Sequence, residues 1–341
     1  MSAHLEKDAR WESSFIGFLY RQFFYRPKPI KADLSGQTAI ITGANVGLGL
    51  ETGRQLLGLG LSRLVLAVRS QAKGDAAAAA LRKEHPSAKI EVWLLDMSSY
   101  ASVHAFVKRC AGDELQRLDM AILNAGVQSP GLIKNEQTGY ETTFQVNYLS
   151  TALLSILLLP VLWEKRSPGR PGRLSVIGSD TQYWASLDPA GGPILPRLAA
   201  PSTFNSMTQY STSKFLLTGF VAKLAGNVNP DEVIVNTVNP GLTASTDISK
   251  DKPPSLPFRI FLQVTGRSLE WGADTYVDGV VVKGKESHGS FVSDWTIKPY
   301  PAIYYTSDGV ELMNRLWEET MEELNFVGVS SIVSKLAQSR A

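Results

Sequence analysis

Short apolar runs alternate with longer helical patterns along most of the chain from Leu34 onward. The short runs are rich in β-branched and aromatic residues and are bounded by glycines or polar residues, as buried strands are. They lie at residues 38–42, 63–68, 89–95, 118–124, 172–178, 232–238 and 289–294. Most intervening stretches, such as residues 72–85, are long enough for a crossover helix. The alternation predicts an α/β fold with a parallel sheet of seven strands, flanked by helices on both faces.

Four other stretches complete the pattern. Residues 150–163 are apolar nearly all round but are too short to span a bilayer, so we expect a helix buried against the sheet. Residues 311–324 show the spacing of an amphipathic helix. Proline and glycine cluster at 166–173 and 187–201, which predicts loops. The second loop is long, and long loops in compact domains often act as functional lids.

The first 33 residues form an extension before the domain of residues 34–341. Within it, Trp11, Phe15, Phe18 and Phe23 recur at roughly helical spacing, which predicts an amphipathic helix. The first ten residues lack the features of a secretory signal, and the segment is too short and too polar to span a membrane. Three interpretations stay open. The helix packs on its own domain, closes over the substrate as a lid, or contacts a membrane surface through residues 11–25.

Composition excludes several classes of function. The 341 residues are 44% hydrophobic and 19% charged, and the net charge is +2, which gives no reason to expect a nucleic-acid partner. The single cysteine, Cys110, allows no internal disulfide, and the four histidines are scattered without ligand spacing, so we expect no metal. A reducing, cytoplasmic compartment is the simplest expectation, with a peripheral membrane position as an alternative.

Glycines follow the first predicted strand in TGANVGLG, residues 42–49, and a helical segment comes next. A strand that runs through glycines into a helix leaves backbone N–H groups free where a phosphate can bind. The spacing of Gly43, Gly47 and Gly49 is G-x-x-x-G-x-G and not the G-x-G-x-x-G of the common dinucleotide fingerprint. Alone, the stretch predicts either a phosphate site or a strand–helix turn without a ligand.

Arg69 follows the second predicted strand and has no acidic neighbour. In dinucleotide sites an acid here accepts from the ribose 2′-OH of NAD, whereas an arginine accommodates the 2′-phosphate of NADP. The sequence therefore favours NADP(H), with an ordinary exposed arginine as the alternative.

The next two strands also end in candidate residues. Asp96 either meets the adenine amino group or caps a helix that begins near Ser98. Asn124 would tie down the end of its strand, and Ala125 and Gly126 are small enough to let a cofactor pass.

Tyr210 and Lys214 lie four residues apart in QYSTSK, residues 209–214. On a helix such residues share a face. The pKa of an isolated tyrosine is about 10, and a neighbouring ammonium favours the phenolate. We therefore expect Lys214 to lower the pKa of Tyr210 toward the range in which acid–base catalysis is effective. Alone, Y-x-x-x-K is a common coincidence.

Together these stretches resemble the short-chain dehydrogenase/reductase family. The matching motifs follow the family's order over about residues 34–245: TGANVGLG (42–49), NAG (124–126), VNYLS (146–150), VIGSD (176–180), YSTSK (210–214) and NPG (239–241). ANVGLG, AVRS and LWEET are most similar to the retinol-dehydrogenase-like branch and to fungal pathway reductases of that branch. The resemblance implies a single Rossmann-like, doubly wound domain and NAD(P) chemistry.

The resemblance also implies residue roles. Tyr210 would be the catalytic acid or base and Lys214 its partner, Ser179 the active-site serine, and Asn147 the residue that holds a water in the proton relay. The implied cofactor-binding residues are Gly43, Asn45, Gly47, Leu48, Gly49, Arg69, Asp96, Asn124, Ala125, Gly126, Tyr210, Lys214, Thr243 and Ser245. One departure from the family is the segment of 30 residues between Ser179 and Tyr210, which is longer than usual and concerns the substrate loop.

The implied function is hydride transfer between NADP(H) and a carbonyl or alcohol of a fairly apolar small molecule, in fungal secondary metabolism. Tyr210 would exchange the proton and Ser179 would steady the developing oxyanion. Two alternatives are a membrane-surface retinol-type dehydrogenase and an NADP-binding scaffold without catalysis. Residues 185–205 and 246–275 match no motif and are expected to select the substrate. The sequence predicts neither the substrate, nor the reaction direction, nor the oligomeric state.

Overall fold

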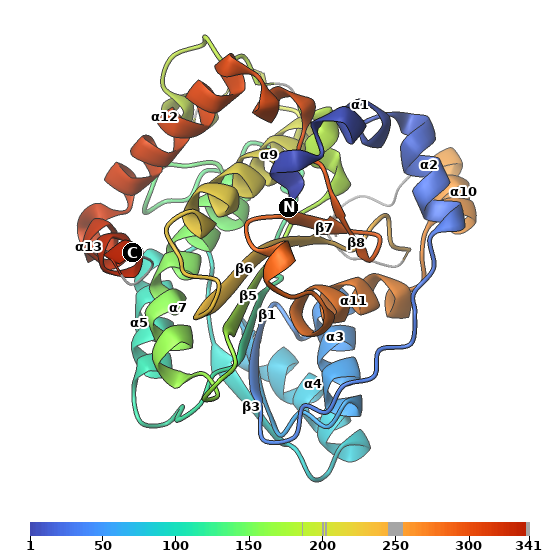
Figure 1. The fold of residues 1–341 in the computed structure, drawn as a ribbon, viewed down its shortest axis with the longest axis vertical. Coiled ribbons are helices and arrows are strands. Elements are labelled where there is room, and N and C mark those ends of the chain that lie inside the picture. Colours follow the sequence, from blue (N-terminus) through green and yellow to red (C-terminus); the bar gives the residue numbers. More distant parts are fainter. Residues whose placement is uncertain (186, 200, 202, 245–254, 339–341) are drawn as a thin grey trace.

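The computed structural model describes the whole chain except residues 186, 200, 202, 245–254 and 339–341 (Figure 1). Its centre is one eight-stranded sheet in the order β3-β2-β1-β4-β5-β6-β7-β8. The strands are β1 (Thr38–Thr42), β2 (Arg63–Val68), β3 (Lys89–Leu94), β4 (Met120–Leu123), β5 (Gly172–Ile177), β6 (Val233–Asn239), β7 (Phe291–Ser293) and β8 (Thr296–Lys298). Strands β1 to β7 are parallel, and β8 runs antiparallel to β7.

The predicted α/β sheet is confirmed, and all seven predicted strands are present. The eighth strand was not predicted, because β8 has only three residues and its hairpin lacks the usual glycine or asparagine signal. Asp294 and Trp295 form the turn, and both have positive φ, 54° and 58°.

The strand order reverses between β1 and β4. The chain first builds outward from β1 to β2 and β3, and then crosses back to place β4 on the other side of β1. In doubly wound sheets this reversal opens a crevice at the carboxyl ends of the two central strands, where ligands bind. The candidate site residues after β1 and β4 therefore share one edge.

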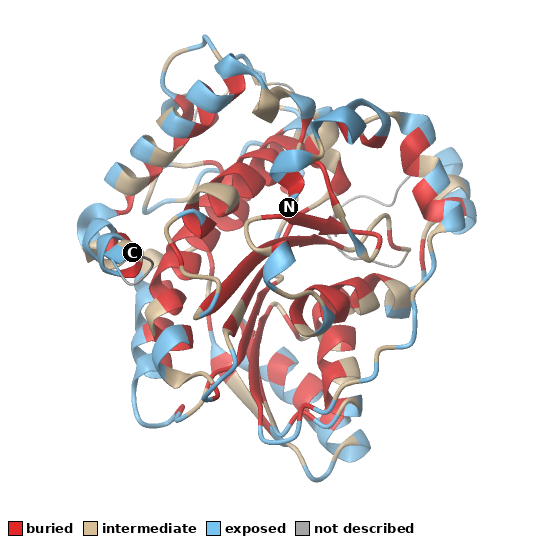
Figure 2. Cartoon of the chain, viewed as in Figure 1, coloured by how far each residue is buried: buried red, intermediate tan, exposed pale blue. Residues whose placement is uncertain are grey.

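Helices cover both faces of the sheet (Figures 1 and 2). On one face, α3 (Gly47–Gly58), α4 (Gln71–Glu84) and α11 (Leu269–Val277) bury residues such as Leu56, Leu81 and Tyr276. On the other face, α5 (Tyr100–Ala111), α7 (Thr151–Lys165) and α9 (Ser206–Ala225) bury the larger apolar cluster. Side chains of α12 (Ser307–Glu323) and α13 (Val329–Gln338) join that cluster. Helix α13 and the short α8 (Ile194–Ala199) were not predicted.

Helix α7 continues a longer helical stretch. It follows α6 (Thr142–Phe144) and a π-helical turn at Gln145–Ser150 without interruption. By length and composition Thr142–Lys165 could cross a membrane, but 89% of its most apolar window is buried inside the protein. The stretch is thus a core helix, as predicted for residues 150–163.

The N-terminal extension packs on the domain. It contains α1 (Ala9–Glu12) and α2 (Phe15–Phe24), and the Ser14 hydroxyl caps α2 by accepting from the Gly17 N–H. Its first residues reach the sheet edge, where the Ser2 hydroxyl donates to the Lys298 carbonyl and accepts from the Phe291 N–H at 2.9 Å. Figure 1 shows the N-terminus beside β7 and α2 beside α10 (Leu256–Thr265).

Candidate active site

Tyr210 and Lys214 lie one turn apart on α9, and both are buried. The Asn205 side chain begins this helix by accepting from the Thr208 N–H at 2.9 Å. The Lys214 ammonium donates to the carbonyl of Ile177, the last residue of β5, at 2.7 Å. It also lies 5.8 Å from the centroid of the Tyr210 ring. The helix therefore holds both groups against the carboxyl end of β5.

Burial shifts the two pKa values in opposite directions. It raises the pKa of Tyr210 to about 12, opposed by a hydrogen bond with Ser179. It lowers the pKa of Lys214 to about 8. The prediction that Lys214 lowers the pKa of Tyr210 is therefore wrong for the protein alone, because loss of hydration disfavours the phenolate more than its neighbours favour it.

Ser179 stands two residues beyond the end of β5 and begins the short 3-10 helix Asp180–Trp184. Its hydroxyl accepts from the N–H and the hydroxyl of Thr181, at 3.3 and 3.0 Å. The strand end thus presents the serine to Tyr210.

Asn147 lies in the π-helical turn before α7. Its side chain accepts from the Val127 N–H at 2.8 Å and donates to the Val127 carbonyl at 2.9 Å and to the Ser213 hydroxyl at 3.2 Å. A Cβ on Gly126 would lie 3.3 Å from Asn147 Oδ1 and 3.7 Å from Lys214 Nζ. The structure therefore brings Asn147, Gly126 and Lys214 to one place, and π-turns of this kind often mark functional sites.

The glycine turn lies beside this cluster. The Asn124 side chain donates to the Thr42 carbonyl at 2.9 Å, which joins the end of β4 to the turn. A Cβ on Gly43 would lie 3.1 Å from Ala125 Cα, and one on Gly49 would lie 2.6 Å from the Asn124 amide nitrogen. A Cβ on Gly47, the first residue of α3, would meet no atom within 4 Å. The turn is thus tight against β4 and open at the helix N-terminus, as a phosphate site requires.

Leu48 and Asn45, two further residues of the turn, differ in how far their side chains are buried. The Leu48 side chain is buried in the core, so only its backbone faces the helix N-terminus. Asn45 is half-buried in the turn itself.

The remaining candidates lie along the same edge. Arg69 is exposed directly after β2. One carboxylate oxygen of Asp96 accepts from the N–H and the hydroxyl of Ser98, at 2.9 and 2.7 Å, so this side chain forms a local turn. Thr243 is buried and pairs with Arg267 in an isolated β-bridge. Ser245 lies outside the described residues.

The predicted substrate segments contain helices, α8 in the first and α10 in the second. The side chains after Ser179 contact the N-terminal extension. The Tyr183 hydroxyl donates to the Pro299 carbonyl at 2.6 Å, and its ring lies 5.9 Å from the Arg21 guanidinium carbon. The Trp184 indole donates to the Ser13 carbonyl at 3.0 Å.

The family model described as "short chain dehydrogenase" matches residues 37–180 and 198–256. The chain belongs to the short-chain dehydrogenase family. This dehydrogenase is an oxidoreductase, and the resemblance inferred from its motifs is confirmed.

The dehydrogenase is similar to curated fungal proteins over nearly its whole length. It is 50% identical to the short chain dehydrogenase virL of Hypocrea virens, covering 99% of this chain and 100% of that protein. It is 45% identical to the short chain dehydrogenase/reductase mfmJ of Annulohypoxylon moriforme, with 95% and 96% covered.

Solved structures share the fold. A short-chain dehydrogenase/reductase from Mycobacterium ulcerans matches with a TM-score of 0.58 at 14% identity, covering 83% of this chain and 98% of that one. The RhlG/NADP complex of Pseudomonas aeruginosa matches with a TM-score of 0.54 at 21% identity, with 76% and 95% covered. A short-chain dehydrogenase from Sphingobium yanoikuyae in complex with NADPH matches with a TM-score of 0.51 at 24% identity, with 71% and 84% covered.

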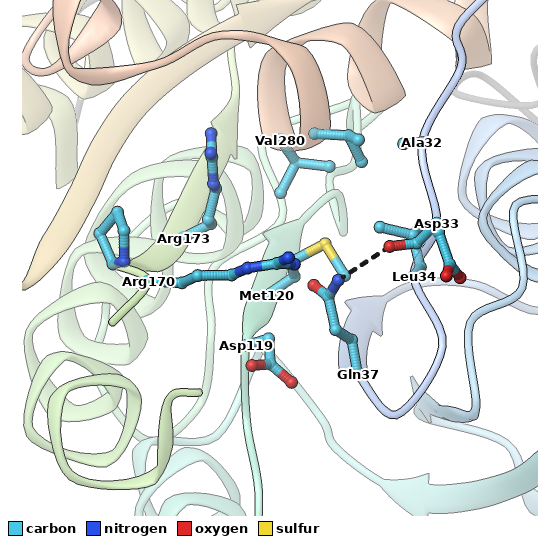
Figure 3. A pocket seen from close by; sticks show the side chains of 11 residues that line it. Ala32, Asp33, Leu34, Gln37, Asp119, Met120, Arg170, Arg173 and Val280 are labelled. Carbon is cyan, nitrogen blue, oxygen red and sulfur yellow. Dashed lines mark hydrogen bonds between the residues drawn. The ribbon is translucent and has the colours of Figure 1, made fainter. Parts of the chain in front are cut away.

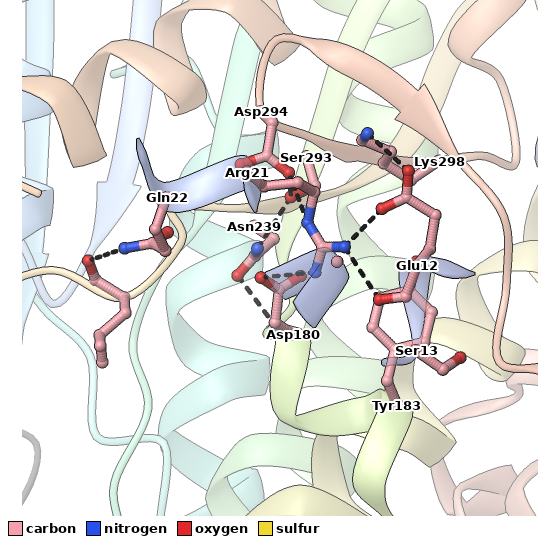
Figure 4. A network of polar contacts seen from close by, with 12 residues as sticks. Glu12, Ser13, Arg21, Gln22, Asp180, Tyr183, Asn239, Ser293, Asp294 and Lys298 are labelled. Carbon is pink, nitrogen blue, oxygen red and sulfur yellow. Dashed lines mark hydrogen bonds and ion pairs between the residues drawn. The ribbon is translucent and has the colours of Figure 1, made fainter. Parts of the chain in front are cut away.

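A buried charge network beside Ser179 was not predicted (Figure 4). Arg21 of α2 is 1% exposed and pairs with Glu12 at 2.5 Å, Asp294 at 3.1 Å and Asp180 at 3.4 Å. Arg267 also pairs with Asp294. The network thus joins the N-terminal extension to the residue after Ser179 and to the β7–β8 turn.

The charges in this network balance. Lys298 pairs with Glu12 at 2.9 Å, so three cations face three carboxylates. Burial raises the pKa of Asp180 despite the nearby Arg21. For Asp294, Arg267 and Arg21 outweigh burial and hold the pKa below its usual value. The only sequence signal was an arginine–glutamine pair, Arg21 and Gln22, within an aromatic helix.

Among the described residues, a cavity of about 410 Å³ lies away from the catalytic cluster (Figure 3). Gln37, Met120 and Arg173 line it, and these residues lie where β1, β4 and β5 begin. The catalytic residues lie at the opposite ends of the strands, so this cavity is not the active site.

Proposed function

We propose that the dehydrogenase transfers a hydride between NADP(H) and the carbonyl or alcohol group of an apolar small molecule. The observation that carries the proposal is the convergence of Ser179, Tyr210, Lys214 and Asn147 beside the glycine turn. The fungal relatives, similar over the whole chain, support this reaction class. A place in fungal secondary metabolism stays a prediction from the sequence.

The residues present fit a nicotinamide dinucleotide. The open space at Gly47 and the free N–H groups that begin α3 suit a pyrophosphate. Exposed Arg69 suits a 2′-phosphate, in keeping with two structural neighbours whose complexes hold NADP and NADPH. When bound, the cofactor supplies the hydride.

The proton would move through Tyr210. With a pKa of about 12 the phenol stays protonated at neutral pH, so it can donate to a carbonyl oxygen in the reductive direction. Ser179 would donate to the same oxygen and steady its developing charge. Lys214, with a pKa of about 8, is largely cationic at neutral pH and would orient the ribose. Asn147 would hold the relay water beside Lys214.

The decisive experiment is Tyr210→Phe. We expect turnover of a ketone and aldehyde panel with NADPH to fall by about 10²-fold or more, with the NADPH Kd changed less than about threefold, since only one hydroxyl is removed. Tyr20→Phe, at an exposed tyrosine, is the matched control and should leave both values unchanged. Full turnover by Tyr210→Phe would reject the mechanism. Wild-type NADPH binding without turnover of any substrate would favour the scaffold alternative.

The cofactor choice has its own test, a titration of wild type and Arg69→Asp with NADPH and NADH. We expect wild type to prefer NADPH, and the substitution to weaken NADPH binding about tenfold or more while NADH changes little, because only NADPH carries the 2′-phosphate. A wild-type preference for NADH would reject the role of Arg69 and leave the hydride chemistry in place.

A further inference from the structure

Helix α2 turns two polar side chains inward, together with Phe18, and turns most of its other apolar side chains outward. Arg21 and Gln22 are buried, whereas Phe15, Ile16 and Phe24 are 56%, 69% and 69% exposed. Surface helices of globular proteins normally show the reverse arrangement. An outward apolar face therefore requires a separate explanation.

Helix α10 extends this apolar face. Thr265 is its one buried residue, and Leu256, Ile260 and Val264 are 67%, 52% and 64% exposed. The rings of Phe15 and Phe261 stack between the two helices with centroids 6.4 Å apart. Figures 1 and 2 show α2 and α10 side by side with much of their surface exposed.

The exposed apolar side chains are concentrated here. Residues 11–24 and α10 hold nearly half of the exposed large hydrophobic residues among those described: Trp11, Phe15, Ile16, Tyr20, Phe23, Phe24, Leu256, Phe258, Ile260 and Val264. Isolated exposed apolar residues are ordinary, but a contiguous patch marks an interaction surface. We call these ten residues the apolar face.

Internal contacts keep the apolar face outward. If α2 rotated to bury its aromatic side chains, Arg21 would leave Asp180 and Asp294, two buried carboxylates. Gln22 would also lose its hydrogen bonds to the carbonyls of Leu242 and Thr265, at 2.9 and 2.8 Å. Leaving buried charges unpaired is strongly unfavourable, so the outward face belongs to the folded state.

The charge around the apolar face indicates its partner. Residues 13–32 and 255–269, which hold all of the apolar face except Trp11, contain no aspartate or glutamate. The exposed charged side chains there are basic: Arg26, Lys28, Lys31 and Arg259. Glu12, beside Trp11, is buried in the charge network, and the nearest exposed acid along the second segment is Glu270, just beyond it. Aromatic and aliphatic side chains bordered by cations are typical of helices that lie in the interface of an anionic bilayer.

We propose that the apolar face of α2 and α10 inserts into the surface of an anionic lipid bilayer. The dehydrogenase then binds membranes peripherally, with α10, which belongs to the predicted substrate segment, on the lipid side. The contact uses no catalytic residue, so it stands or falls independently of the proposed reaction.

The test is flotation of the full-length protein with vesicles of equal parts phosphatidylcholine and phosphatidylserine, against phosphatidylcholine alone. We expect binding to the anionic vesicles that weakens as salt is added. The double variant Ile16→Ser/Phe24→Ser should lower the partition coefficient by about tenfold for each side chain, the effect of withholding one large apolar group from lipid. Val310→Ser, at an exposed valine of α12, is the control and should bind as wild type does.

Three results would overturn the proposal. The wild type fails to float with anionic vesicles, or the double variant floats as well as the wild type does. In the third, the wild type does not bind vesicles, and sedimentation shows that it is a dimer whereas the double variant is a monomer. The apolar face would then be an interface between two copies of the chain. Equal melting temperatures of wild type and double variant exclude unfolding as the cause of lost binding.

Discussion

At the scale of single residues, burial decides the chemistry of the site. Tyr210 and Lys214 share a helix face as their spacing predicts, yet burial sets the direction in which each pKa shifts. A sequence gives the spacing of two groups but not the hydration each one loses. The direction of the Tyr210 shift was therefore beyond sequence reasoning, although the pairing was within it.

The buried cation of Lys214 should lower stability at neutral pH. Its folded pKa of about 8 lies below the 10.5 of an ordinary lysine. The unfolded chain thus binds the Lys214 proton more tightly than the folded chain does. The resulting loss of folding stability is complete below about pH 8 and disappears as the pH rises to about 10.5. Lys214→Met should abolish activity but stabilise the fold at pH 7 by about 2 kcal/mol. Removing the buried charge should gain about 3 kcal/mol, and losing the hydrogen bond to Ile177 should cost about 1 kcal/mol.

Thermal melts of wild type and Lys214→Met at pH 7 and pH 10 measure this difference. The gain in melting temperature should shrink between the two values. If Lys214→Met is no more stable than the wild type at pH 7, burial of the Lys214 charge does not lower the stability of the fold.

Two glycines of α3 should respond in opposite ways to alanine. A Cβ on Gly49 would meet the Asn124 side chain at 2.6 Å, so Gly49→Ala should cost about 1–3 kcal/mol and weaken cofactor binding. A Cβ on Gly58 meets nothing within 4 Å, so Gly58→Ala should gain up to about 1 kcal/mol from helix propensity. Urea unfolding of both variants gives the comparison, and similar effects at the two sites would refute the close approach of α3 to β4.

At the scale of elements, the sequence predicted the strands and helices that are long enough to show a periodic pattern of apolar residues. Strands β1, β2, β4, β5 and β6 are largely buried runs, and the edge strand β3 is half-buried but rich in β-branched and aromatic residues. Helices α4, α7 and α12 have helical patterns or propensities of several turns, so local sequence sufficed for all of these elements. The elements it missed are short, such as β8 and α8. The turn before β8 places Asp294 and Trp295 in left-handed conformations, which aspartate adopts occasionally but tryptophan rarely does. Asp294 is held there by ion pairs with Arg21 and Arg267.

Replacing a buried and an exposed arginine near α2 should change the stability of the protein by different amounts. Arg21→Leu would leave Asp180 and Asp294 without a major partner in a buried place, so we expect a loss of about 3–5 kcal/mol. Without Arg21, the pKa values of the two buried carboxyl groups should rise. The loss of stability should therefore be smaller at low pH, where these groups take up protons and become neutral. Arg26→Leu, at an exposed arginine 5.0 Å from the Trp271 ring centroid, should cost about 1 kcal/mol or less.

Chemical denaturation at pH 7 and pH 5 separates the two variants. Equal costs for Arg21→Leu and Arg26→Leu would mean that the buried network does not hold the extension to the domain.

At the scale of the whole molecule, the order of motifs predicted the sheet and its ligand-binding edge, because doubly wound sheets bring strand ends together by rule. The packing of the extension was not predictable in this way. Arg21 and Asp180 are separated by 159 positions, and no local pattern relates them. The sequence therefore left a packed helix, a lid and a membrane contact open together. The structure shows that packing and an outward apolar face are compatible, because they use opposite sides of α2.

Hydrogen exchange distinguishes a packed extension from a mobile lid. Ser2 is hydrogen-bonded to β7 and β8, and Arg21 is buried in the charge network, so the extension is tied to the sheet at both ends. Its amides should then open only with the domain, and peptides from residues 9–24 should exchange about as slowly as those from β7 and α11. Residues 28–33, which have no regular structure, should exchange fast in the same sample. In Arg21→Leu, protection of residues 9–24 should fall while that of β1 and β4 persists. If residues 9–24 exchange as fast as 28–33 in the wild type, the extension opens by itself, and its apolar face is available to close over the substrate.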